Sequence, residues 1–138
     1  MTAALPADGI IARAFGGAVI ASATAPGPAS YDDYGQRFVF VPAVGDMDHY
    51  ALDVECRSTP VPPQLERSLR PYFSRLGVPF FDGWTRLEVS AKLSGRPVLE
   101  RVNEIKGTCL FSDDENTVIL RVDTSTHWIA VGRRRHFG

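Results

Sequence analysis

The sequence predicts one α+β domain, in which a mainly antiparallel sheet of about six strands packs with one main helix and a short second helix. Several segments are rich in β-branched and aromatic residues or alternate apolar with polar side chains, and turn-forming residues separate them. One segment, at residues 62–76, repeats its apolar residues every three or four positions, as an amphipathic helix does. A chain of 138 residues can bury one hydrophobic core without a metal or a disulfide.

Residues 1–30 are interpreted as an N-terminal segment and linker that precedes a single α+β domain at 31–138. They are rich in Ala and Gly, and the Pro-Gly-Pro run at 26–28 cannot continue a helix or an inner strand. A short helix or strand is expected within 10–23. Residues 14–25 resemble a secretory signal peptide, but Asp8 is acidic where the start of such a signal is basic. We therefore expect a cytoplasmic protein.

The next two segments predict strands. Residues 37–44 are mostly aromatic and β-branched, and Pro42 indicates an edge strand because proline cannot donate a ladder hydrogen bond. Residues 49–57 alternate between two sets of side chains. One face carries Tyr50, Leu52, Val54 and Cys56, and the other carries His49, Asp53 and Glu55. We expect the first face in the core and the second in solvent.

The helix at 62–76 begins with two prolines and ends before a glycine, which is typical of a helix start and a helix end. Its apolar side is expected to pack against the sheet. Residues 84–93 alternate between apolar and polar side chains, and this is the clearest strand pattern in the chain. The next segment is ambiguous but favours a short helix at about 97–106. The last three strands are predicted at 108–111, 117–123 and 126–133.

The composition does not favour a nucleic acid, a membrane or a zinc ion as partner. The chain has 15 basic and 16 acidic residues and a formal net charge of −1, which gives no general attraction to nucleic acid or to an anionic membrane. No stretch reaches the ~20 apolar residues that cross a bilayer. Cys56 and Cys109 lack the spacing of a zinc site, so we expect two reduced, buried thiols and no metal or other cofactor.

The densest group of functional side chains surrounds a predicted turn and the strand after it. It comprises Asp46, Asp48, His49, Asp53 and Glu55. Asp46, His49 and Asp53 could converge on a divalent cation, but their spacing matches no known metal-binding loop. We interpret the group as a solvated acidic rim, which either a basic partner or the chain's own arginines would neutralise.

The sequence identifies no catalytic set, and the candidates for catalysis are His49, His127 and Cys56. Asp123 and Ser125 lie in one hairpin with His127 and cannot form a triad with it, because triad members converge from separate elements. A pairing of His127 with a distant carboxylate, or with Cys56 as a thiol nucleophile, is left open.

The C-terminal strand carries a second group of binding candidates, Trp128, Arg133, Arg134 and Arg135. Strand alternation places Arg134 on the face opposite to Arg133 and Arg135. Arginine binds carboxylates and phosphates through paired donors. A solvated, fraying chain end is the first interpretation of these arginines, and an acidic protein partner is the second. Few aromatic side chains accompany them, so nucleic acid is the least favoured partner.

These features favour a non-enzymatic protein-binding module, such as a toxin-neutralising, adaptor or structural component that binds a protein partner or a second copy of itself. The excess of Arg over Lys suggests a GC-rich bacterial or phage genome. The first alternative is a small enzyme that uses His49 or His127 with a carboxylate, and the second is a nucleic-acid binder that uses the C-terminal arginines. A pocket around a histidine, an exposed aromatic patch or a continuous arginine face would distinguish the three.

Overall fold

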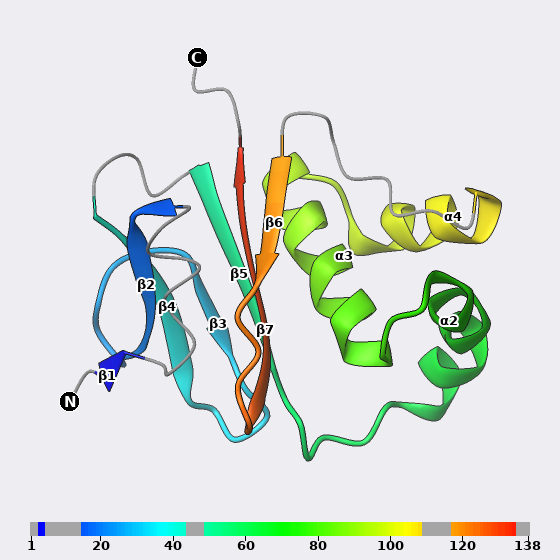
Figure 1. Ribbon diagram of the computed structural model, residues 1–138, viewed down its shortest axis with the longest axis horizontal. Helices are drawn as coiled ribbons and strands as arrows, with labels where there is room; N and C mark the ends of the chain where they lie inside the picture. Colours follow the sequence, from blue (N-terminus) through cyan, green and yellow to red (C-terminus); the bar gives the residue numbers. More distant parts are fainter. Residues whose placement is uncertain (1–2, 5–14, 44–48, 109–116, 135–138) are drawn as a thin grey trace.

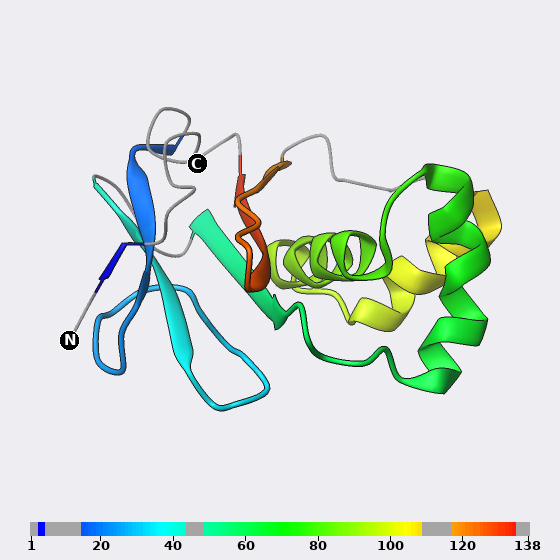
Figure 2. The same ribbon diagram turned by 60° about the horizontal axis from the view of Figure 1, so that its bottom comes forward.

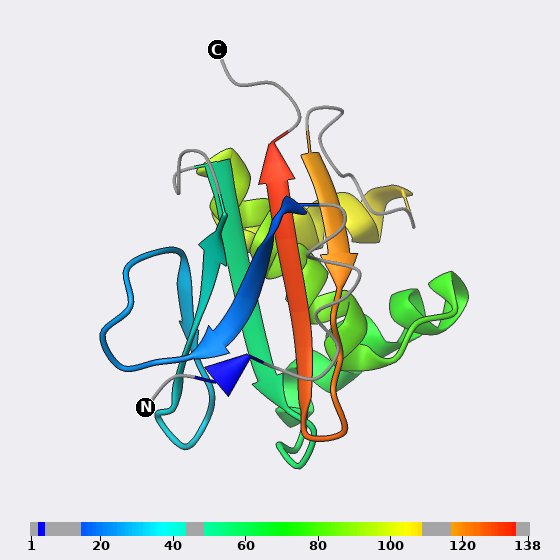
Figure 3. The same ribbon diagram turned by 60° about the vertical axis from the view of Figure 1, so that its left-hand side comes forward.

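The structure is a computed structural model that describes residues 3–4, 15–43, 49–108 and 117–134. The strands in these residues form two antiparallel sheets, and the helices form a separate layer. One sheet, which we call the central sheet, lies between the helices and the other sheet, which we call the outer sheet (Figure 1 and Figure 3). The predicted α+β class with antiparallel strands is therefore confirmed. The prediction of a single sheet is wrong, because the strands divide between two sheets.

The outer sheet has the strand order β1-β2-β4-β3, and the central sheet has the order β5-β7-β6. The outer strands are β1 (Ala3–Ala4), β2 (Gly17–Ala21), β3 (Ala29–Tyr31) and β4 (Arg37–Pro42). The central strands are β5 (Tyr50–Cys56), β6 (Thr117–Arg121) and β7 (His127–Arg134). The helices are α2 (Pro63–Leu76), α3 (Phe80–Ser94) and α4 (Val98–Thr108). None of these helices is both long and apolar enough to cross a membrane.

Most of the predicted elements are present within a few residues of their expected ends. The segments predicted as strands at 37–44, 49–57, 117–123 and 126–133 correspond to β4, β5, β6 and β7, and β7 extends one residue beyond its predicted end. The helices predicted at 62–76 and 97–106 are α2 and α4. The strand predicted at 108–111 lies outside the described residues except for Thr108, which ends α4.

The prediction of a strand at 84–93 is wrong, because these residues belong to α3. One side of α3 packs on the central sheet through Val89 and Leu93, and another side packs on α2 and α4 through Leu87. A helix buried on two sides needs apolar residues in more than one stripe. Its apolar residues then no longer show one 3.6-residue period, and here their spacing resembles the alternation of a strand. The contact with the sheet is close, since a Cβ at Gly132 of β7 would lie 2.5 Å from Cγ1 of Val89.

The main core lies between the two sheets. Its buried members are Phe15, Val19, Phe38, Phe40, Leu52, Val54, Val122, Ile129 and Val131. Val19 belongs to β2, which pairs with β4 along its whole length. The structure thus places part of residues 1–30, assigned from the sequence to an N-terminal segment and linker, inside the folded domain.

β4 is an inner strand and not the edge strand that Pro42 indicated. It pairs with β2 on one side and with β3 on the other. Pro42 is the last residue of β4 and lies opposite Gly17 of β2. β3 pairs with β4 only from Arg37 to Val39, so Pro42 lies beyond the residues that pair with β3. The missing donor of Pro42 therefore costs no hydrogen bond to β3.

Both faces of β5 are covered. Leu52, Val54 and Cys56 are buried as predicted, whereas Tyr50 of the same face is half-buried. Cys56 is a free thiol, and Cys109 lies outside the described residues. The opposite face was expected in solvent, but Asp53 is buried and Glu55 is half-buried. The reason is that α3 lies over this face of the central sheet (Figure 1).

The expectation that the main helix packs against the sheet is also wrong. The buried residues of α2, Leu69 and Phe73, lie in a cluster with residues of α3 and α4. The buried members of this helical cluster are Leu69, Phe73, Phe80, Phe81, Leu87, Val102 and Ile105. α3 is thus the helix that connects α2 and α4 with the central sheet (Figure 1).

Candidate functional site

Three turns meet at one end of the two sheets, at the bottom of Figure 1. They are the turn between β3 and β4, the loop after β5 and the turn between β6 and β7, at residues 32–36, 57–62 and 122–126. We call this the loop end, and Figure 2 turns it toward the viewer. Loops held by a rigid scaffold are where binding and catalytic residues concentrate.

The turn at 32–36 forms because Asp32 and Gly35 occupy positions that a hairpin turn favours for these residue types. Oδ1 of Asp32 accepts hydrogen bonds from the backbone amides of Tyr34 and Gln36, both at 2.9 Å. The amide of Gly35 donates to the carbonyl of Asp32, and Gly35 has a φ of 80°, which glycine adopts without strain. These bonds hold Oδ1 inside the turn and leave Oδ2 for a contact outside it.

Oδ2 of Asp32 faces a histidine and a cysteine at the strand ends that adjoin the other two turns. It lies 3.1 Å from Nε2 of His127, the first residue of β7. The same Nε2 lies 3.6 Å from Sγ of Cys56, the last residue of β5. The antiparallel pairing of β5 with β7 places Cys56 directly opposite His127. We call Asp32, Cys56 and His127 the Asp–Cys–His cluster.

The cluster lies mostly below the surface. Asp32 and Cys56 are 7% and 4% exposed, and His127 is partly exposed. The ring of Phe38 meets the imidazole of His127 edge to face, with 4.8 Å between the ring centroids. Nδ1 of His127 lies 2.8 Å from the hydroxyl of Thr126. Both imidazole nitrogens therefore have polar partners within the chain.

Burial and hydrogen bonding act differently on the pKa values of the two acids. Burial alone would raise the pKa of Asp32, but hydrogen bonds from His127 and from two backbone amides bring that pKa below its ordinary value. Burial raises the pKa of the Cys56 thiol, and the nearby Asp32 carboxylate raises it further. At neutral pH the cluster therefore holds a carboxylate and a protonated thiol.

This geometry does not provide the relay of a thiol enzyme. A catalytic imidazole takes the proton of its nucleophile on one nitrogen and is oriented by a carboxylate on the other. Here Asp32 and Cys56 both face Nε2 of His127, and the raised pKa keeps the thiol protonated. The sequence left open a pairing of His127 with a distant carboxylate or with Cys56, and the structure brings both to it. Sequence reasoning missed Asp32, for which the available signal was the turn pattern Asp-Asp-Tyr-Gly at 32–35.

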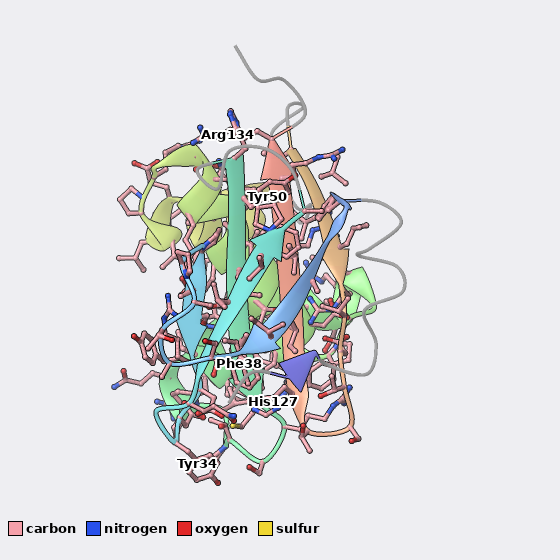
Figure 4. All side chains as sticks on the ribbon, turned by 90° about the vertical axis from the view of Figure 1, so that its left-hand side faces the viewer. Tyr34, Phe38, Tyr50, His127 and Arg134 are labelled. Carbon is pink, nitrogen blue, oxygen red and sulfur yellow. The ribbon has the colours of Figure 1, made fainter. Side chains whose placement is uncertain are left out.

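The loop end also carries exposed aromatic side chains. Tyr31 is 63% exposed and Tyr34 is 80% exposed. Figure 4 shows Tyr34 extending from the end where His127 lies, whereas Arg134 lies at the opposite end. The hydroxyl of Tyr34 is 3.5 Å from the hydroxyl of Ser58 in the loop after β5. Sequence reasoning singled out neither tyrosine, because exposure depends on how the turns pack.

Tyr31 forms part of the wall of a hollow of about 340 Å³. The hollow is lined by Ala21, Ser22, Ala23, Tyr31, Gly35, Gln36 and Arg37. The guanidinium group of Arg37 donates to the carbonyls of Ser22 and Ala25, at 3.2 and 2.7 Å. The hydroxyl of Ser22 accepts the amide of Ala25 at 2.9 Å. The hollow is therefore bounded by hydrogen-bonded backbone, which holds its shape before any ligand binds.

Part of the predicted acidic surface lies inside the fold. Asp46 and Asp48 are outside the described residues, and His49 is half-buried just before β5. Asp53 is 7% exposed, and its Oδ1 lies 3.5 Å from Nζ of Lys92 on α3. Burial raises the pKa of Asp53 and of the half-buried Glu55 to about 7. These two carboxyl groups belong to the contact between β5 and α3.

The other predicted binding residues lie along β7. Trp128 packs against the helical cluster, and the guanidinium group of a neighbouring arginine stacks on it, 3.9 Å from the ring centroid. Arg133 and Arg134 lie on opposite faces of β7, as strand alternation predicted. Arg133 lies over an aromatic ring of the main core, and Arg134 donates to the carbonyl of Leu93 near the end of α3. Arg135 lies outside the described residues.

Comparison with models of protein families, with curated proteins and with solved structures finds no match to this chain. The functional conclusion therefore rests on the geometry of the loop end.

Proposed function

We propose that this chain is a protein-binding module whose partner docks on Tyr31, Tyr34 and the hollow beside them. The observation that carries the proposal is the pair of exposed tyrosines. Tyr31, 63% exposed, lines the hollow, and Tyr34, 80% exposed, precedes Gly35, another residue of its lining. Tyrosine is enriched in protein interfaces because it combines a large apolar area with a hydrogen-bonding group. Its side chain has few torsions, so it loses little entropy when a partner immobilises it.

The lining of the hollow indicates what the partner presents. Ala21 and Ala23 contribute small apolar side chains, and Gln36 contributes an amide. Nη1 of Arg37 donates to two backbone carbonyls, so this side chain helps to shape the hollow. We expect a protein segment that inserts an apolar side chain and places polar groups against Gln36 and the tyrosine hydroxyls. Contacts of this kind suit a toxin-neutralising, adaptor or structural component.

Site-specific photocrosslinking tests the proposal. The photoreactive residue p-benzoylphenylalanine replaces Tyr31, Tyr34 or, as a matched control, Leu99 in the full chain, which is produced in cells of the source organism. Leu99 is 68% exposed but belongs to α4, on the far side of the central sheet (Figure 1). We expect one adduct of the same mass from positions 31 and 34 and no such adduct from position 99.

Alanine variants then measure the contribution of each tyrosine. Tyr31→Ala and Tyr34→Ala should each weaken association with the crosslinked partner at least tenfold, since truncation of an interface hot spot costs ~2 kcal/mol or more. Leu99→Ala should leave the affinity unchanged, and all three variants should unfold at the wild-type temperature. Equal crosslinking from position 99, or unchanged affinity in the double tyrosine variant, would contradict the proposal. An adduct of twice the chain mass would identify the partner as a second copy.

A further inference from the structure

The Asp–Cys–His cluster also has the donor atoms of a metal site. We propose that Asp32, Cys56 and His127 bind one transition-metal ion of the zinc class through Oδ2, Sγ and Nε2. These donor atoms all lie within 4.8 Å of one another. His127 is 71 residues from Cys56 and 95 from Asp32 in the sequence, so no local spacing motif reveals the set.

The distances fit tetrahedral coordination. With metal–sulfur and metal–nitrogen bonds of about 2.3 and 2.0 Å, tetrahedral angles separate the sulfur from the nitrogen by ~3.5 Å and the nitrogen from a carboxylate oxygen by ~3.3 Å. The corresponding distances in the cluster are 3.6 Å from Sγ to Nε2 and 3.1 Å from Nε2 to Oδ2. The third distance, from Sγ to Oδ2, is no more than 4.8 Å. Two of the three donor pairs therefore already have nearly the spacing that a tetrahedral ion requires.

The surroundings orient the donors as metal sites require. Two backbone amides hold Oδ1 of Asp32, so this side chain presents Oδ2 alone. Nδ1 of His127 lies 2.8 Å from the hydroxyl of Thr126, which accepts a hydrogen bond from Nδ1–H when Nε2 binds the ion. Metal-binding histidines usually donate their second N–H to such a group, and ligating carboxylates are usually hydrogen-bonded in turn.

The charges of the donors select the kind of ion. A thiolate and a carboxylate together neutralise a divalent cation, so the loaded cluster carries no net charge and suits a buried position. Thiolate and imidazole favour zinc-class ions, whereas magnesium and calcium take oxygen ligands. Binding releases the thiol proton of Cys56 to solvent, because a thiolate is the ligand. Three protein ligands leave one position for a water molecule.

Metal titration of the wild-type chain gives the first test. Protein freed of metal with a chelator, in the presence of a reductant, is titrated with Zn(II) or Co(II). We expect one Zn(II) per chain and release of about one proton for each ion bound. Co(II) should produce a thiolate-to-cobalt charge-transfer band that saturates at one ion per chain and that Zn(II) removes. A large excess of Mg(II) should not compete.

Variants assign the ion to the cluster. Cys56→Ser should remove the charge-transfer band, and Asp32→Asn and His127→Gln should each weaken Zn(II) binding at least tenfold. Cys109→Ser and His49→Gln are the matched controls, since they change the second cysteine and another histidine of the chain, and both should bind Zn(II) as the wild type does.

Circular dichroism of each metal-free variant shows whether it folds, so that lost binding is separated from lost structure. If a variant does not fold, the cobalt spectra of the wild type and of Cys109→Ser provide the test instead. The charge-transfer band requires a cysteine ligand, and Cys56 is the one cysteine that Cys109→Ser retains. Substoichiometric Zn(II) binding by the wild type, or a band that survives Cys56→Ser, would overturn the proposal and leave a hydrogen-bonded cluster. Photocrosslinking at Tyr34 tests the partner surface independently of this result.

Discussion

Gly83 of α3 lies directly against the ring of Phe73 of α2, so closely that a Cβ at residue 83 would be 2.6 Å from two atoms of that ring. The two helices approach to this distance because glycine has no side chain. The ring of Phe73 also meets the ring of Phe80 edge to face, with 5.4 Å between their centroids. Residue 83 therefore fits into a packed aromatic region with no space for a methyl group.

Replacing Gly83 with alanine should lower the free energy of unfolding by about 1–3 kcal/mol, because the added methyl group displaces Phe73 or the helix axis. Gly107→Ala is the matched control, since residue 107 is also helical and a Cβ there would meet no atom within 4 Å. That change should raise stability by up to about 1 kcal/mol through helix propensity. Urea unfolding of both variants measures the difference, and equal effects would contradict the close packing of α2 on α3.

Leu69→Ala should lower the free energy of unfolding by about 2–5 kcal/mol, because it leaves a cavity in the helical cluster. Leu69 is 0% exposed and lies among side chains of α2, α3 and α4. Leu99→Ala serves as the control, since Leu99 is 68% exposed and its truncation should change stability by less than about 0.5 kcal/mol. A wild-type denaturation midpoint for Leu69→Ala would show that α2 does not pack in this way.

Arg121→Ala should cost about 2–3 kcal/mol, because Arg121 joins the central sheet to α3 through charged hydrogen bonds. Its guanidinium group binds both carboxylate oxygens of Asp123, at 3.0 and 2.7 Å, and donates to Thr85 and to the carbonyl of Asp82 at 2.9 Å. Arg96→Ala removes a more exposed arginine that also pairs with carboxylates and should cost less than about 1 kcal/mol. Thermal unfolding compares the two, and similar losses would mean that the Arg121 network adds little beyond surface pairing.

The sequence predicts the element that buries a single face, but it does not reveal where a second face is covered. The apolar residues of α2 recur in one stripe, and the helix is where that stripe predicts it. Val89 and Leu93 of α3 face the central sheet while Leu87 faces the helical cluster, and the combined pattern resembles a strand. Asp53 was expected in solvent for the same reason, since alternation identifies the two faces of β5 but not the helix that covers one of them.

For the candidate site, the sequence predicted which residue types could act but not which residues would meet. His127 and Cys56 are reactive side chains that the sequence analysis named, and their strands were placed correctly. Their contact depends on the register between β5 and β7, and Asp32 joins them only because the outer sheet packs on the central one. The exposure of Tyr34 has a similar origin, because it follows from how the turns meet and not from any periodicity in the sequence.

Asp53 is a buried carboxyl group whose surroundings favour its protonated form. Among the described residues its Oδ2 has no hydrogen-bond partner, and its Oδ1 lies 3.5 Å both from Nζ of Lys92 and from the hydroxyl of Ser30. Burial raises its pKa to about 7, Lys92 lowers this pKa, and Glu88 on α3 and Glu55 on β5 raise it. The folded state therefore holds a proton over a pH range in which the unfolded chain has released it.

The free energy of unfolding should accordingly rise as the pH falls from about 8 to about 4, since stability increases toward the pH at which both states are protonated. A pKa of about 7 in the folded state against 3.8 for the ordinary group gives Asp53 a contribution of up to about 4 kcal/mol. Asp53→Asn cannot titrate, so it should be more stable than the wild type at high pH and of similar stability at low pH. Glu55 and Glu88 remain in both proteins, and the comparison isolates Asp53.

Urea unfolding of the wild type and of Asp53→Asn at several pH values measures this difference. Glu66→Gln is the control for removal of a carboxylate, because the hydrogen bond from Arg70 lowers the pKa of Glu66. A group with a lowered pKa contributes stability that is lost as the pH falls. At high pH the wild type should therefore have a higher free energy of unfolding than Glu66→Gln, whereas it should have a lower one than Asp53→Asn. If the difference between wild type and Asp53→Asn is the same at every pH, Asp53 ionises as an ordinary carboxyl group, and α3 does not exclude water from this face of β5.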